Sequence, residues 1–122
     1  RRGDLDRAES SLRRHLEWNR RVDGRVGGAF ILTQLGFVAE QRGEARRARE
    51  LHEQARQEAR RSGDPRALAL ALEGLAGAHA LEGERGRALE LLRRAETLRE
   101  GAGAPLARTE RWDVDRIAAR LG

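Results

Sequence analysis

The chain has 122 residues, of which 25 are arginine and 20 are acidic, and its formal net charge is +5. This length suits one domain, and the absence of cysteine excludes disulfides, thiolate metal sites and a cysteine nucleophile. The longest uncharged run, 26–39, is too short to span a bilayer, and the missing initiator methionine suggests a piece of a longer polypeptide.

A 40-residue repeat organises the chain. Gly3, Gly43 and Gly83 coincide when the sequence is shifted by 40, and each is followed by an acidic residue. Repeats of about 20 to 50 residues are typical of stacked supersecondary units. We therefore predict an all-α fold, a right-handed α-solenoid of antiparallel helical hairpins with about six helices and no strands.

In chain order, the repeat divides the sequence into a half repeat at 1–24, full repeats at 25–63 and 64–104, and a capping helix at 105–122. The half repeat holds one helix, which ends near residue 21. Each full repeat holds two helices, because apolar residues recur three and four positions apart. Gly63 suits a left-handed helix end, Asp64 a helix cap and Pro65 the first turn of the next helix.

The last helix departs from the repeat. We expect a loop at 101–104 and a helix from Pro105 to about Leu121. Trp112 keeps an apolar repeat position, but Asp115 and Arg116 replace the apolar and small residues of the earlier units. A polar terminal helix is what a solenoid needs to remain soluble.

Glycines and histidines inside the helices indicate packing rather than chemistry. Gly36, Gly74 and Gly77 would each destabilise a helix by about 1 kcal/mol relative to alanine, so we expect neighbouring helices to approach closely there. His15, His52 and His79 fall at repeat core positions, outside any motif such as His-Glu-x-x-His, and Trp18 falls near a helix end, where we expect it to pack. We predict no metal, no cofactor and no catalytic residues, hence no enzyme.

The repeat positions resemble those of the tetratricopeptide repeat family. The matching residues are Leu35-Gly36, Gly43, Ala48 and Ala55 in one unit, and Leu75-Ala76, Gly83, Ala88 and Ala95 in the next. The stretch 83–122 also resembles the C-terminal repeats of large actinobacterial LuxR-type and antibiotic-pathway signal-ATPase regulators. These resemblances imply a protein–protein interaction module of a larger cytoplasmic signalling or transcription regulator.

The resemblance to tetratricopeptide repeats also implies a binding surface, because the first helix of each repeat lines a concave groove in that family. The implied groove residues are Phe30, Thr33, Phe37, Glu40, Gln41, Leu70, Glu73 and Gly77. Such a groove would bind a peptide or a neighbouring domain. Alternatively, Phe30 and Phe37 simply pack against an adjacent repeat.

Other functions stay open at this stage. The arginine content suggests a nucleic-acid-binding array, but pairs such as Glu9 and Arg13 favour solvated helix faces instead. A small-molecule sensor could use the same groove. No membrane association is expected, and homodimerisation through the truncated N-terminal face is a further expectation.

Overall fold

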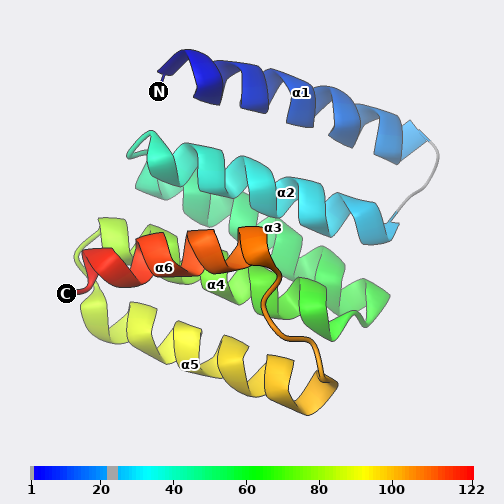
Figure 1. Cartoon of the computed structure of the whole chain (residues 1–122). Coiled ribbons are helices and arrows are strands. Elements are labelled where there is room, and N and C mark those ends of the chain that lie inside the picture. Colours follow the sequence, from blue (N-terminus) through cyan, green and yellow to red (C-terminus); the bar gives the residue numbers. More distant parts are fainter. Residues whose placement is uncertain (1, 22–24) are drawn as a thin grey trace.

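The computed structural model describes residues 2–21 and 25–122, and this part of the chain is helical, with no strand (Figure 1). The helices are α1 (Arg2–Arg21), α2 (Arg25–Gln41), α3 (Ala45–Ser62), α4 (Pro65–Leu81), α5 (Arg85–Ala102) and α6 (Arg108–Arg120). The predicted all-α class and the six helices are therefore confirmed. The predicted repeat boundary at residue 24 lies outside the described residues.

Two antiparallel hairpins, α2–α3 and α4–α5, form the body of the fold (Figure 1). Helix α4 packs against both helices of the preceding hairpin, and α1 packs against α2. Helix α4 is buried without interruption over 69–78, since other helices surround it, whereas α3 and α5 expose charged residues. The right-handed solenoid arrangement stays a prediction.

The turns between hairpin helices explain the spacing of the glycines. Gly43, Gly63, Gly83 and Gly103 adopt φ angles of 79°, 70°, 78° and 62°. They recur every 20 residues, so one helix with its turn is half of the repeat. The caps predicted around Gly63 are confirmed, because the Asp64 carboxylate accepts a hydrogen bond of 3.0 Å from the Arg66 backbone N–H at the start of α4.

The last helix begins later than predicted. Helix α5 continues to Ala102, and α6 begins at Arg108 instead of Pro105. The reason is a cap, since the Glu110 carboxylate accepts a 3.0 Å hydrogen bond from the Ala107 backbone N–H, before the new helix start. The intervening connection turns the chain back, so that α6 packs on α4 rather than continuing the stack (Figure 1).

A buried histidine fills a slot between helices α2, α3 and α4. The His52 side chain is 0% exposed, and a Cβ atom added at Gly36 or Gly74 would lie 2.4 or 2.1 Å from its ring. The Phe37 ring meets it edge-on, with centroids 5.0 Å apart. Neither ring nitrogen of His52 has a hydrogen-bond partner. The close helix packing predicted at these glycines is confirmed.

Three side chains expected at packed positions are exposed instead. His15 on α1 is exposed, and Trp18 on the same helix is 58% exposed, because within the described residues α1 packs on one side only. Trp112 is 64% exposed, because α6 lies on α4 and not in the next repeat position. His79 is half-buried, as predicted.

The slot around His52 makes the effect of Gly74→Ala predictable. The new Cβ would overlap the ring of His52, and overpacking of this kind destabilises a protein by about 1–3 kcal/mol. Gly86→Ala is the matched control, since no atom lies within 4 Å of its added Cβ. We expect this control to be neutral or up to about 1 kcal/mol more stable in urea unfolding. Equal effects of the two substitutions would contradict the packing argument.

Burial of His52 also predicts a pH dependence of stability. Desolvation lowers the pKa of His52 from 6.5 to about 3. Well above pH 6.5, near pH 8, the ring is neutral in the folded and the unfolded chain, so it adds no pH dependence there. As the pH falls below that value, the unfolded chain binds a proton that the folded chain binds only near pH 3, and stability decreases. The loss is about 2 kcal/mol between about pH 8 and pH 5.

The measurement is urea unfolding across this pH range, compared with a His52→Leu variant. The variant keeps His15 and His79, so it isolates the buried ring. We expect the difference in unfolding free energy between the two chains to change by about 2 kcal/mol from about pH 8 to pH 5. A constant difference would show that the folded chain protonates His52 readily.

Candidate functional site

Helix α6 covers the face of α2 and α4 on which the predicted groove residues lie. Five of these side chains are at most 3% exposed, namely Thr33, Phe37, Glu40, Leu70 and Glu73. Gly77 is also buried, Phe30 is partly buried and Gln41 is exposed. The groove was expected to be free for a partner, but here the chain's own last helix occupies it.

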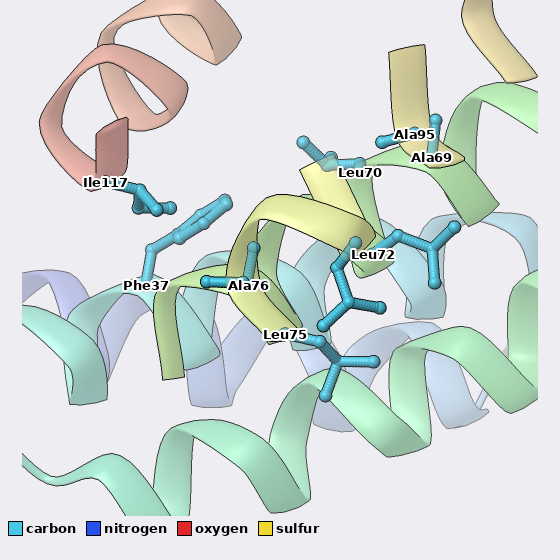
Figure 2. Packing of buried hydrophobic residues seen from close by; sticks show 10 residues of the cluster. Phe37, Ala69, Leu70, Leu72, Leu75, Ala76, Ala95 and Ile117 are labelled. Carbon is cyan, nitrogen blue, oxygen red and sulfur yellow. The ribbon is translucent and has the colours of Figure 1, made fainter. Parts of the chain in front are cut away.

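A single isoleucine anchors α6 in this face. Ile117 is 0% exposed and belongs to the same apolar cluster as Phe37 and Leu70. Figure 2 shows its side chain directed from α6 toward the ring of Phe37. A Cβ atom added at Gly77 would lie 2.9 Å from the Ile117 Cδ1 atom. The glycine therefore provides the space into which the isoleucine packs.

Two arginines of α6 neutralise a buried carboxylate of α2. Glu40 is 0% exposed, and its Oε2 atom lies 3.2 Å from the Arg116 Nε and 3.1 Å from an Nη atom of Arg120. Arg116 also donates to Asp113 at 2.7 Å and lies over the Phe37 ring, 5.7 Å from its centroid. Burial opposes the charge of Arg116, but hydrogen bonds to Glu40 and Asp113 raise its pKa.

A second buried ionic network joins α4, α5 and α6. Arg99 donates to both oxygens of Glu73, at 2.7 and 2.9 Å, and to the Glu110 carboxylate at 3.2 Å. Arg66 also donates to Glu110. Burial raises the pKa of Glu73, because the cost of desolvation exceeds the stabilisation of its charge by Arg99.

The other predicted residues of α2 are engaged within the chain or exposed. The Thr33 hydroxyl donates to the backbone carbonyl of Ala29 at 3.0 Å. The guanidinium of Arg66 lies 5.0 Å from the centroid of the Phe30 ring. Only Gln41 among the eight predicted residues is exposed to solvent, at the C-terminal end of α2. The buried polar side chains among them, Thr33, Glu40 and Glu73, thus already have partners within the chain.

A separate pocket of about 540 Å³ opens between α5, the connection to α6, and α6 itself. Leu89 and Leu92 of α5, Leu106 of the connection and Val114 of α6 form its apolar wall. Glu73 and Arg99 also line it. This pocket lies beside the predicted groove and was not anticipated from the sequence.

Three side chains at the α4–α5 turn lie close enough to share a metal ion. The candidate ligand atoms of His79, Glu82 and Glu84 are all within 4.8 Å of one another. Glu82 already accepts a hydrogen bond of 2.7 Å from Arg49, and His79 lies 2.6 Å from Glu84. Each of the three side chains therefore already has a partner within the chain. This cluster was not predicted from the sequence. The sequence signal for the cluster is the spacing of three residues from His79 to Glu82.

Sequence reasoning missed the polar residues that hold α6 in place. These residues are Arg99, Glu110, Arg116 and Arg120, and they pair with residues of other helices, up to 80 positions away in the chain for Arg120 and Glu40. The available signal was Arg116, which replaces the small residue of the repeat pattern. That replacement was interpreted as polarity of a capping helix and not as a contact.

No helix in the described ranges is both long and apolar enough to cross a membrane. Comparisons of the chain with known protein families, with curated proteins and with solved structures found no match. The case for function therefore depends on the geometry of α6 and the surfaces around it.

The network around Arg99 predicts a large effect of Arg99→Leu. This substitution leaves the buried carboxylate of Glu73 without its partner, and such a loss destabilises a protein by about 3–5 kcal/mol. Adding Glu73→Gln removes the uncompensated charge and should recover at least about 1 kcal/mol. The control Arg93→Leu, at an exposed position of α5, should change the unfolding free energy by less than about 0.5 kcal/mol.

Thermal and urea unfolding of the three variants would measure these effects. If Glu73→Gln makes the Arg99→Leu chain still less stable, the buried charge is not the source of the destabilisation.

Proposed function

We propose that the chain is a protein-interaction module whose α2–α4 face binds an amphipathic helix, and that α6 is its intramolecular occupant. The observation that supports this proposal is the docking of α6, which places one apolar anchor and two arginines on that face. Helix-in-groove recognition uses a few apolar anchors at helical spacing, and α6 presents such a set.

The contacts of α6 define the helix that would compete with it. Val114, Ile117 and Leu121 follow the spacing of one helix face, and Ile117 and Leu121 belong to or pack on the apolar cluster. Arg116 and Arg120 meet the buried Glu40. A competing helix would therefore carry a branched aliphatic residue over Gly77 and a basic residue directly before it or three positions after it.

The apolar contacts of α6 with the rest of the fold are few, which favours its displacement by a competing helix. Ile117 is its only fully buried apolar side chain, and α6 contacts α4 far less extensively than the hairpin helices contact each other. Burial of one isoleucine contributes about 1.5–3 kcal/mol. A tethered helix with so little buried area belongs to the least stable part of the fold, from which binding elements are drawn.

The proposed parent protein, and with it the source of the competing helix, is based on the resemblance to repeat regions of large regulators. On that basis we infer that the competing helix belongs to another domain of the same parent chain or to a separate protein. A cytoplasmic bacterial signalling or transcription regulator is the proposed parent. In such a regulator, a partner helix that replaces α6 on the α2–α4 face would leave α6 exposed to solvent.

The proposal predicts binding of a helix in trans once α6 is displaced. The test compares the unchanged chain with a variant chain that carries both Arg116→Glu and Ile117→Asp. The ligand is a fluorescent peptide with the native sequence 108–120. We expect the variant chain to bind this peptide at least about tenfold more tightly than the unchanged chain, because the tethered α6 competes at an effective concentration in the millimolar range. Fluorescence anisotropy measures the affinity.

Two controls accompany this measurement. A chain with Arg111→Glu, at an exposed position of the same helix, should behave like the unchanged chain. A peptide that itself carries Ile117→Asp should not bind. The proposal fails if the variant chain keeps its helical circular dichroism and still shows no saturable binding of the native peptide.

A further inference from the structure

The pocket beside α5 has the size and lining of a small-molecule site. Its volume of about 540 Å³ lies within the range of about 300–1,000 Å³ usual for ligand pockets. The apolar wall consists of Leu89, Leu92, Leu106 and Val114, all of them only half-buried. An apolar ligand body would complete their burial.

The polar groups of the pocket restrict the head group of such a ligand. The charged residues that line the pocket are three acids, Glu73, Glu96 and Glu100, and two bases, Arg93 and Arg99. The lining therefore carries one more acid than base. Arg99 already donates to Glu73, Glu110 and the carbonyl of residue 104. The remaining capacity for hydrogen bonds is thus mainly that of carboxylate acceptors. The two exposed carboxylates of Glu96 and Glu100 outnumber the one exposed guanidinium of Arg93, so a donor with positive charge fits these groups better than an anion does.

The position of the head group follows from the cost of burying charge. Glu73 is 3% exposed and already paired, so an ammonium group placed beside it would lose its hydration for little gain. Glu96 and Glu100 are exposed and lie four residues apart on one face of α5. A cation at these two carboxylates stays partly hydrated while the apolar body enters the pocket.

We propose that this pocket binds an amphiphilic amine, with the apolar body against Leu89, Leu92, Leu106 and Val114 and the protonated amino group between Glu96 and Glu100. The site lies beside the α2–α4 face, and no partner helix is needed to form it. The inference therefore extends beyond the proposed interaction function.

The same geometry links the ligand to the docking of α6. One side of the pocket is formed by Val114 of α6 and by Leu106, two residues before that helix, so the pocket is complete only while α6 is docked. A ligand that binds only the docked state multiplies the equilibrium constant for docking of α6 by 1 + [L]/Kd. At a ligand concentration of ten times Kd, opening of α6 becomes about elevenfold less frequent.

The test uses n-octylamine, protonated at neutral pH, with octanoate as the probe of opposite charge. Octanoate has the same number of carbon atoms but an alkyl tail one carbon shorter, and this difference alone weakens binding about fourfold. Isothermal titration calorimetry on the full chain should give saturable binding of octylammonium with a Kd of about 1 mM or tighter. Octanoate should bind at least about twentyfold more weakly at low salt, and the difference should shrink toward about fourfold as salt screens the carboxylates.

Variants on α5 locate the site. Leu89→Trp fills the pocket and should abolish binding, whereas Leu98→Trp, a substitution at a half-buried leucine of the same helix that borders a different cavity, should retain it. Glu96→Gln with Glu100→Gln should weaken octylammonium binding about three- to tenfold and leave octanoate binding no weaker. Glu90→Gln, at an exposed position outside the pocket lining, is the charge control.

Amide exchange of residues 108–120, measured with and without octylammonium, tests the link to α6. We expect slower exchange in the unchanged chain and no change in Leu89→Trp. The proposal is overturned if octylammonium shows no saturable binding, if octanoate binds equally well, or if both tryptophan variants bind alike. Failure of the peptide to bind the α2–α4 face would leave these results intact, so the two proposals fail separately.

Discussion

The burial of Glu40 is the constraint on which the arrangement of α6 depends. This carboxylate is fully buried on α2, and in the structure its charged partners are Arg116 and Arg120 of α6. A buried carboxylate without a partner is strongly unfavourable, so α6 has to stay docked or leave the face open to water. Because departure of α6 also hydrates Glu40, undocking exchanges ion pairs for solvent and does not strand a charge. The contact is therefore specific without being irreversible.

The shape of the face comes from residues that lack side chains. Gly36 and Gly74 admit the ring of His52 between the helices, which brings α2 and α4 close enough to form one continuous surface. Gly77 then leaves the space that Ile117 fills. Larger residues would separate the helices or fill that space. At these positions glycine therefore lowers the intrinsic stability of the helix but allows the helices to pack closely. The unpaired ring nitrogens of His52 are a cost of the same arrangement.

The 40-residue period was sufficient to predict the turns at Gly43, Gly63 and Gly83 and the helices that they connect, because local signals carry that information. The glycines at 43, 63 and 83 and the cap at Asp64 act within a few residues of their position in the chain. The placement of α6 was not predictable in this way, since Arg116 meets a residue 76 positions earlier. The predicted groove residues were located on one face, but their burial depends on that distant contact. The repeat pattern describes how units stack and says nothing about a helix that folds back over them.

Helix α6 is shared by the two proposed sites, and this has a thermodynamic consequence. A partner helix on the α2–α4 face requires α6 to leave, whereas an amine in the pocket requires Leu106 and Val114 to stay in place. Two ligands that favour opposite states of one element oppose each other, and the coupling is equal in both directions. The amine would weaken partner binding by the same factor by which the partner weakens amine binding. The sign of this coupling follows from the position of α6 alone, because α6 lines the pocket and covers the face at the same time.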